Sequence, residues 1–394
     1  MYGFPLSGLL LNKRLLPYDF GNRPFRGNDR DANASFYHKK MENIENPPTN
    51  NRCIRSSKVR QQFLDIQAIR QDNDTGGPFQ QSKVLYKKGK KVSHKIVSKS
   101  RLSENVFAAD VEAPFVARAR KPGQFVIISI NNEYGERIPL TIADADPEKG
   151  TIRLIWQRVG KTTAELADLQ VGDEIANVVG PLGKPTHVEN FGTVVCVGGG
   201  IGIAPLLPIA KALRMAGNKI ISILGARDKQ LLILENEFAR ISDELIVTTD
   251  DGSYGQKGLV TEPLKQVCQR AWHGLPARED TAKMAVPRCP DRAFVIGPAV
   301  MMKACCEVTK EFNIPTEVSL NTIMVDGTGM CGGCRVEIDG QPKFVCVDGP
   351  EFDGHKVNFD LMIKRLNAYK NQEQSAYEQY KKHRCKIGLD KQGI

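Results

Sequence analysis

The sequence lacks any run of eighteen or more apolar residues, so it offers no segment suited to a transmembrane helix. Its ten cysteines in 394 residues are unevenly spaced and do not form a disulfide framework, which favours a reducing, cytoplasmic compartment. Hydrophobic residues make up 41% and charged residues 25% of the chain, as in an ordinary globular protein. The length suits two or three domains.

An excess of positive charge is also missing from most of the chain, although the formal net charge is +10. Residues 1–92 contain 17 Lys and Arg against 8 Asp and Glu, whereas the remainder contains 38 against 37. The body of the protein therefore has no electrostatic reason to bind nucleic acid. Residues 1–91 show no helical or strand periodicity, and we expect them to be a disordered basic extension.

A glycine-rich stretch at residues 324–349 carries Asp326, Cys331, Cys334 and Cys346. Iron–sulfur clusters are held mainly by cysteine thiolates, and a Cys-x-x-Cys pair with a later cysteine is a usual arrangement. The interleaved glycines allow the positive φ angles and close backbone approach that a loop around a cluster needs. The pattern therefore favours a [2Fe-2S] cluster.

Two other interpretations of these cysteines stay open. A redox dithiol usually begins a helix after a strand, whereas this pair lies in a glycine loop and strand-like sequence follows it. Half of a zinc site would need a fourth ligand, for which His355 is the nearby candidate. In the zinc case the chain would be a non-redox adaptor.

Short β-prone runs separated by turn residues begin near residue 92 and predict a small antiparallel barrel. They are His94–Ser98, Val106–Val111, Gln124–Ile130, Arg137–Ala143 and Thr151–Arg158. After them, Thr162 or Thr163 is placed to cap a predicted helix at Ala164–Leu169. A helix N-terminus with free N–H groups and a threonine hydroxyl suits a phosphate.

Residues 192–202 read as a buried strand that runs into a glycine turn, and Ala204–Met215 reads as the helix that follows. This order opens a dinucleotide-binding fold, in which the pyrophosphate meets backbone N–H groups. Pro205 takes the place of the last glycine of the usual fingerprint and still suits a first helical turn. Three further strands end in small or polar residues, which predicts a nucleotide crevice at their carboxyl ends: Lys219–Leu224, Leu245–Thr249 and Ala293–Ile296.

From about Val92 to Tyr369 the chain resembles the ferredoxin-reductase superfamily, specifically electron-transfer subunits of the dihydroorotate dehydrogenase and sulfide dehydrogenase type. Three motifs in order carry the resemblance: Arg137-Ile-Pro-Leu-Thr141, Gly198-Gly-Gly-Ile-Gly-Ile-Ala-Pro205, and the loop from Asp326 to Cys346. Within this group the chain is most similar to the small subunits of NADH-dependent reduced ferredoxin:NADP oxidoreductases.

The resemblance implies an α/β plus all-β fold. An antiparallel FAD-binding β-barrel would be followed by a Rossmann-like parallel-sheet NAD domain and a small [2Fe-2S] loop domain. The implied divisions are the extension at 1–91, the barrel at 92–189, the NAD(P)-binding domain at 190–315, the cluster-binding loop at 316–355, and a C-terminal helix and tail at 356–394. Helical character in the tail runs over Asp360–Lys381.

The resemblance also implies residue roles. FAD would be held by Arg137, Pro139, Leu140 and Thr141, and its pyrophosphate by Gly160, Thr162 and Thr163. The nicotinamide crevice would be lined by Gly200, Gly202, Pro205, Gly225, Asp250 and Gly297. The cluster ligands would be Cys331, Cys334 and Cys346, with Asp326 as the fourth, as in bifurcating ferredoxin:NADP enzymes. A loop-capping role for Asp326 remains the alternative.

The implied function is a flavin and iron–sulfur oxidoreductase subunit that passes electrons between NAD(P)H, FAD and a [2Fe-2S] cluster. A nicotinamide delivers electrons in pairs and a cluster accepts them singly, so a flavin must lie between them, and no catalytic acid or base is needed. The electrons would pass to or from a larger flavin, iron–sulfur or dehydrogenase partner subunit, with ferredoxin reached through that partner. The alternative is the electron-transfer subunit of NAD-dependent dihydroorotate dehydrogenase, in pyrimidine biosynthesis.

Overall fold

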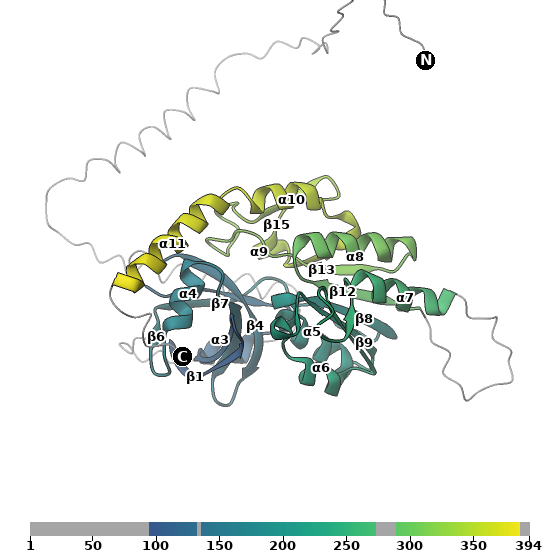
Figure 1. Ribbon diagram of the computed structural model, residues 1–394, viewed down its shortest axis with the longest axis horizontal. Coiled ribbons are helices and arrows are strands. Elements are labelled where there is room, and N and C mark those ends of the chain that lie inside the picture. Colours follow the sequence, from purple (N-terminus) through teal and green to yellow (C-terminus); the bar gives the residue numbers. More distant parts are fainter. Residues whose placement is uncertain (1–93, 132–134, 273–288, 387–394) are drawn as a thin grey trace, which may run out of the picture. The chain divides into compact units, whose positions relative to one another are not determined.

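The computed structural model describes residues 94–131, 135–272 and 289–386. The predicted extension at 1–91 lies outside these residues. The described chain forms two seven-stranded sheets and a two-stranded hairpin (Figure 1). None of the helices in these ranges combines the length and apolar character needed to cross a bilayer.

The first sheet has the strand order β6-β1-β2-β5-β4-β3-β7, and its paired strands are antiparallel. Strands β6 and β7 are separated in sequence by Ala176 alone, yet they stand at opposite ends of this order. The sheet must therefore curl until its two edges come close together, which confirms the predicted barrel. Its elements are β1 His94–Ser103, β2 Val106–Glu112, α3 Pro114–Ala119, β3 Phe125–Ser129, β4 Arg137–Asp146, β5 Thr151–Gln157, α4 Lys161–Asp168, β6 Glu174–Ile175 and β7 Asn177–Leu182.

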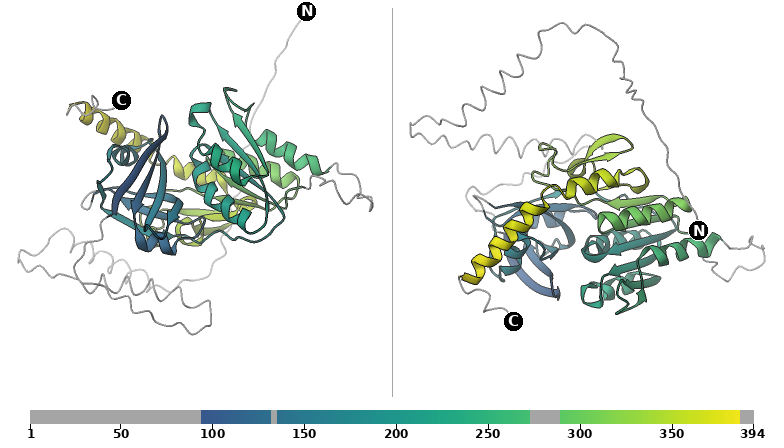
Figure 2. Two further views of the ribbon diagram at one scale, coloured as in Figure 1. Left: turned by 90° about the horizontal axis from the view of Figure 1, so that it is seen from below. Right: turned by 45° about the horizontal axis from the view of Figure 1, so that its top comes forward.

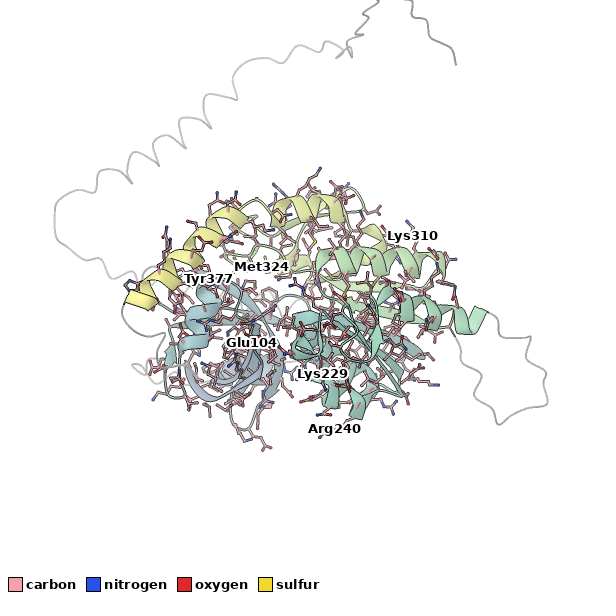
Figure 3. All side chains as sticks on the ribbon, in the orientation of Figure 1. Glu104, Lys229, Arg240, Lys310, Met324 and Tyr377 are labelled. Carbon is pink, nitrogen blue, oxygen red and sulfur yellow. The ribbon has the colours of Figure 1, made fainter. Side chains whose placement is uncertain are left out.

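Strand β3 is buried on both of its faces. Because side chains alternate along a strand, Val126 and Ile128 enter the barrel core while Phe125 and Ile127 enter a different one. This second core continues through the parallel sheet to the cysteine loop and includes Met324, which Figure 3 labels. The barrel wall and the cysteine loop thus share one apolar core.

The second sheet has the order β11-β10-β9-β8-β12-β13-β16. All its pairings are parallel except that of β16 with β13. Helices α5 and α6 cover one face and α7 and α8 the other (Figure 1). Five of its strands have the doubly wound order 3-2-1-4-5, which confirms the predicted Rossmann-like domain.

The elements of this domain follow the chain as a strand–helix alternation. They are β8 Thr193–Gly199, η1 Gly200–Gly202, α5 Ile203–Met215, β9 Lys219–Ala226, η2 Lys229–Leu231, α6 Glu235–Ile241, β10 Glu244–Thr249, β11 Gln256–Lys257, α7 Thr261–Trp272, β12 Arg292–Ile296, α8 Ala299–Glu311 and β13 Thr316–Ser319. The last strand, β16 Glu351–Asp353, comes from beyond the cysteine loop.

Strands β13 and β16 both fall in the segment 316–355 that the sequence assigns to the cluster loop. They contain four and three residues, too few to show a strand period in the sequence. Their pairing anchors both ends of the cysteine loop to the edge of the parallel sheet. The division into domains remains a proposal. In it, β13 and β16 belong both to the 316–355 segment and to the edge of the parallel sheet.

The cysteine loop leads into an antiparallel hairpin of β14 Arg335–Ile338 and β15 Gln341–Phe344. Its turn, Asp339-Gly340, has positive φ angles at both residues (53° and 70°), as a type I′ turn requires. The short helix α9 Val345–Asp348 and the turn η3 Gly354–Lys356 follow.

The tail differs from the single helical stretch predicted over Asp360–Lys381. It forms two helices, α10 Phe359–Leu366 and α11 Lys370–Lys386, which are separated by a bend (Figure 2). The bend lets α10 bury Phe359 and Met362 beside the hairpin while α11 reaches α4 of the barrel. There the Tyr380 hydroxyl donates a hydrogen bond to the Asp168 carboxylate.

Candidate functional site

The glycine turn after β8 lies at the switch point of the parallel sheet, between β8 and β12, where the strand order reverses. Ligands of open α/β sheets bind at this point. Gly202 packs so closely on the end of β12 that a Cβ atom there would collide with the carbonyl oxygen of Ile296. Glycine permits this contact, which keeps the start of α5 beside the end of β12.

The structure places all six predicted crevice residues at the carboxyl edge of this sheet. Gly200 and Gly202 form η1, and Pro205 lies in the first turn of α5. Gly225 is paired beside Gly199 in neighbouring strands, while Asp250 and Gly297 follow β10 and β12. The edge therefore presents mainly backbone groups, which suits a dinucleotide, and each residue's contact with a nucleotide remains a prediction.

The predicted FAD residues come from two segments that the structure brings together. Arg137, Pro139, Leu140 and Thr141 lie on β4, paired with β3. The Thr162 hydroxyl in α4 donates a hydrogen bond to the Glu136 carboxylate, immediately before Arg137. The start of α4 thus lies beside the start of β4. Glu136 could not be singled out from the sequence, because it belongs to no motif and is 26 residues from Thr162.

The two threonines of α4 have different environments. The Thr163 hydroxyl accepts hydrogen bonds from the backbone N–H groups of Val159 (3.1 Å) and Gly160 (2.9 Å) and donates to the Gly160 carbonyl (3.0 Å). Helix α4 therefore begins earlier than predicted: Gly160 is its N-cap residue, and Thr163, in the first turn, reaches back to it as in a capping box. The Thr162 hydroxyl faces the start of β4 instead. Their predicted contacts with a pyrophosphate remain predictions.

The cysteine loop packs directly on the barrel. Gly327 has a φ of +81°, and a Cβ atom there would lie 2.6 Å from Ile127 Cδ1 and 2.8 Å from Leu182 Cδ1. Further along, the Lys184 backbone N–H donates to the Gly349 carbonyl at 2.6 Å. Ile127 of β3 pairs with Pro139 of the predicted flavin motif in β4. The loop therefore packs on the strand next to that motif.

Asp326 is engaged in hydrogen bonds within the loop. Its Oδ2 accepts from the backbone N–H groups of Thr328 (3.0 Å) and Met330 (3.2 Å) and from the Thr328 hydroxyl. Burial alone would raise the pKa of this carboxyl, but these hydrogen bonds and the positive charge of Arg137 hold the pKa below its usual value. The carboxylate is thus ionised near neutral pH and caps the loop. Its ligation of a cluster remains a prediction.

The structure brings Cys334 and Cys346 together, with 3.2 Å between their sulfur atoms. Cys331 is exposed, and its sulfur accepts from the Gly333 N–H at 3.4 Å. Burial raises the pKa of the Cys346 thiol to about 12, and the neighbouring thiols of Cys334 and Cys331 add to the shift. Binding of a metal at this thiol would therefore release a proton.

As they stand, the described side chains include no group of three or more His, Cys, Asp or Glu residues close enough to hold a metal ion. Cys334 and Cys346 converge, while Cys331 lies on the glycine loop beside them and Asp326 caps that loop. Three soft thiols, with backbone N–H groups directed at two of their sulfurs, nevertheless form the donor set that an iron–sulfur cluster requires.

The other two interpretations of the cysteines fit the geometry less well. His355, the candidate fourth zinc ligand, has its Nε2 3.0 Å from the Thr309 hydroxyl in α8. A redox dithiol would place its first cysteine at a helix N-terminus, whereas Cys331 lies in a loop before β14. The surroundings of the loop favour a cluster over both.

Comparison with known proteins agrees with this geometry. Residues 321–358, which include all four predicted ligands, match the family described as the iron-sulfur cluster binding domain of dihydroorotate dehydrogenase B. A Thermotoga maritima protein named as a homologue of the dihydroorotate dehydrogenase B (NAD(+)) electron transfer subunit is 49% identical over 289 residues, covering 73% of this chain and 96% of that protein. The electron transfer subunit of Desulforamulus reducens is 33% identical, over 67% and 96% of the two chains.

A solved structure gives the same result for the fold. It is described as the NADH-dependent reduced ferredoxin-NADP oxidoreductase, in work on flavin-based electron bifurcation. Its chain is 49% identical to this one and superposes with a TM-score of 0.65, over 74% of this chain and 99% of that chain. The expected resemblance is therefore confirmed.

Proposed function

Because the chain belongs to the family of dihydroorotate dehydrogenase B electron-transfer subunits and their homologues, we propose that it is an FAD- and [2Fe-2S]-containing NAD(P)H oxidoreductase subunit. In this proposal it carries electrons between NAD(P)H, FAD and the cluster, to or from a larger partner subunit, as in ferredoxin:NADP oxidoreductases. The observation that carries the proposal is the packing of the cysteine loop on β3 and β7, beside the predicted flavin strand β4.

The chain's own residues would bind and orient the cofactors. Arg137 and the β4 backbone would face the flavin, and the N-terminus of α4 with Thr162 would bind its pyrophosphate. The switch-point glycines would admit the nicotinamide nucleotide close to backbone N–H groups. Cys331, Cys334 and Cys346, with Asp326, would hold the cluster. Once bound, the flavin would exchange electron pairs with the nicotinamide and single electrons with the cluster.

The apolar core shared by barrel and loop would exclude water between these sites. It includes Phe125 and Ile127 of β3 together with Cys334 and Cys346. The eight cysteines between Cys196 and Cys346 are free, which is the state that ligand thiols need and that a reducing compartment maintains. A cytoplasmic location is accordingly part of the proposal.

A second candidate is the electron-transfer subunit of an NAD-dependent dihydroorotate dehydrogenase. The names of the relatives favour it. The aspartate at position 326 opposes it, since the resemblance implies four cysteine ligands in the orotate-linked subunits. The two candidates share cofactors and differ in the partner, so the protein that co-purifies with the chain discriminates them.

The proposal is tested by purifying the full chain without oxygen and measuring its cofactors. We expect bound FAD, together with iron and acid-labile sulfide in equal amounts. Anaerobic addition of NADH or NADPH should bleach the flavin absorbance and produce the paramagnetic signal of a reduced [2Fe-2S] centre. A colourless protein that binds zinc and no flavin would instead support the adaptor interpretation.

A further inference from the structure

Helix α10 lies beside the hairpin that follows the cysteines and is tied to it at both ends. At its start, the Asn358 side chain donates to Glu337 Oε1 (2.8 Å) and the Asn358 backbone N–H donates to the Glu337 carbonyl (3.0 Å). At its other end, Arg365 Nη2 donates to the Gly333 carbonyl at 3.2 Å. The helix therefore holds β14 at Glu337 and the loop that leads into it at Gly333.

The bond from Arg365 reaches the middle of the ligand loop. Gly333 lies between Cys331 and Cys334, and the residues between the two cysteines are both glycine. Such a segment has wide backbone freedom and no side chain with which to anchor itself. The preceding part of the loop is held by Asp326, through Thr328 and Met330, but these bonds do not reach Gly333. The Gly333 N–H bond to the Cys331 sulfur and the Arg335 N–H bond to the Gly332 carbonyl are local, whereas Arg365 ties the segment to a separate helix.

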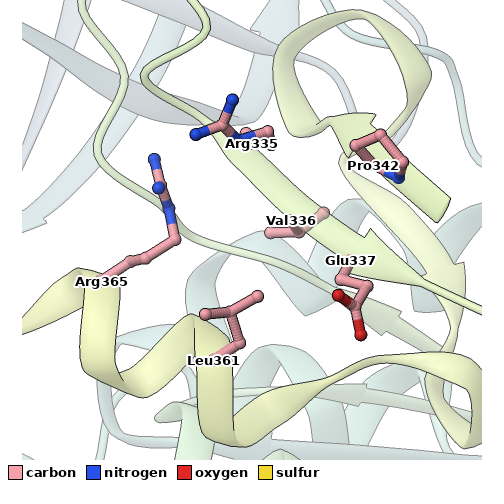
Figure 4. Close-up of a pocket in the computed structure, with 6 residues that line it drawn as sticks. All are labelled: Arg335, Val336, Glu337, Pro342, Leu361 and Arg365. Carbon is pink, nitrogen blue, oxygen red and sulfur yellow. The ribbon is translucent and has the colours of Figure 1, made fainter. Parts of the chain in front are cut away.

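The guanidinium of Arg365 lines a pocket of about 230 Å³ between α10 and the hairpin (Figure 4). The pocket is lined by Arg335, Val336, Glu337, Pro342, Leu361 and Arg365. The two arginines extend into it from opposite elements, Arg335 from β14 and Arg365 from α10. Arg335 is exposed, whereas Arg365 is partly buried against the loop. The side chain of Arg335 therefore provides a matched arginine for comparison.

We infer that Arg365 is a positioning residue for the iron–sulfur cluster: by holding the Gly333 carbonyl it restrains the Cys331–Cys334 segment, which carries two of the predicted ligands. The inference depends on the proposed function, because it needs the cluster. Outer groups that orient metal ligands commonly change metal affinity by about 10- to 100-fold when they are removed. The hydrogen bond that Arg365 makes with the ligand loop goes to a backbone carbonyl, so in this inference it acts through the backbone.

Two physical effects of Arg365 are separable. Its hydrogen bond restrains the loop, and so slows loss of the cluster. Its positive charge favours the reduced form, which carries one more negative charge, and so raises the midpoint potential. Arg365→Gln removes the charge and weakens the restraint. Arg365→Lys keeps the charge on a more flexible side chain without the planar fork.

The test compares Arg365→Gln, Arg365→Lys and Arg335→Gln with the unchanged chain, each purified anaerobically with its cluster. The first measurement is the rate at which an iron chelator bleaches the cluster absorbance. We expect Arg365→Gln to lose its cluster about ten-fold faster. Arg365→Lys should lie between it and the unchanged chain, and Arg335→Gln should match the unchanged chain. The second measurement is the midpoint potential, which should fall in Arg365→Gln and recover in Arg365→Lys.

Equal chelation rates in Arg365→Gln and Arg335→Gln would overturn the inference, as would an Arg365→Gln cluster with unchanged potential. Thermal unfolding of each variant after removal of iron shows whether the substitution merely weakens the fold. If the iron-free Arg365→Gln variant is destabilised enough to account for its faster loss of the cluster, that result would also count against a positioning role. Absence of iron and sulfide from the unchanged chain would refute the proposed function itself, which is a different result.

Discussion

Two glycine-rich loops carry the candidate site, and they are held in place by different means. The turn at 198–202 is fixed by its neighbours in the parallel sheet, where Gly198 pairs with Leu224 and Gly199 with Gly225. The cysteine loop is anchored at its ends by β13 and β16, but between them it is fixed by contacts from distant parts of the chain: Ile127 and Leu182 of the barrel and Arg365 of α10. The position of a loop that is held by regular strand pairing can be predicted from the sequence. For a loop that is held by scattered contacts, the sequence predicts only the composition and the chemistry it suits.

The largest expected effect falls on the first loop. Gly202→Ala would place a methyl group against the backbone of Ile296, which cannot turn aside as a side chain can. We expect a loss of stability of about 3 kcal/mol. The thermal unfolding midpoint of the full chain measures it. Gly200→Ala is the control, since its Cβ meets open space and its φ of +54° alone should cost about 1 kcal/mol. Equal losses would refute the close-approach argument.

The matching change in the second loop is Gly327→Ala. Its left-handed φ and its contacts with two side-chain ends, Ile127 Cδ1 and Leu182 Cδ1, should cost about 2 kcal/mol, less than at Gly202 because those ends can shift. Iron content should fall with stability. Gly340→Ala, at a φ of +70° in open space, should cost about 1 kcal/mol and leave the iron content unchanged. An unchanged iron content in Gly327→Ala would show that iron binding does not depend on the packing of the loop against Ile127 and Leu182.

The pH dependence of stability tests the contact between Glu351 of β16 and Thr186, which lies in the segment that follows the barrel. Burial raises the pKa of the Glu351 carboxyl from 4.5 to about 7, against the opposing hydrogen bond that the Thr186 hydroxyl donates at 2.6 Å. The folded chain thus binds more protons than the unfolded chain between pH 4.5 and 7, so stability falls as pH rises through this window, by on the order of 2 kcal/mol. Glu351→Gln should remove that fall in urea unfolding midpoints.

Glu148 is exposed, so Glu148→Gln is the control for this pH effect. The stability of this variant should fall with pH as steeply as that of the unchanged chain. If Glu351→Gln also retained the full slope, another group would have to be responsible. The measurement therefore decides whether the contact between β16 and the segment leading from the barrel carries the pH dependence.

The smallest effect on stability, and the most specific, is expected from Asp326→Cys. If the carboxylate ligates the cluster, the variant should keep a [2Fe-2S] spectrum while its midpoint potential falls, because a thiolate donates more electron density than a carboxylate. Redox titration followed by electron paramagnetic resonance measures this shift. An unchanged potential would assign Asp326 solely to the loop-capping role that its hydrogen bonds to Thr328 and Met330 display.

The sequence predicted the barrel and the parallel sheet because their strands alternate or run apolar over five to ten residues, and because glycine turns mark their ends. It did not predict that β13 and β16 join the same sheet, since three or four residues carry no period. The bend between α10 and α11 was also missed, because it depends on what each helix touches. Glu136 and Arg365 could not be found in the sequence, since each acts on a segment about 30 residues away that shares no motif with it.

The apolar core that runs from β3 of the barrel to the cysteine hairpin has a mechanical consequence. A hinge motion between these regions would expose Phe125, Ile127, Cys334 and Cys346 to water. Because exposing buried apolar surface is unfavourable, such a motion would be rare. The distance an electron crosses inside the chain is thus set when the chain folds. Control of electron transfer by movement between these two regions is therefore disfavoured.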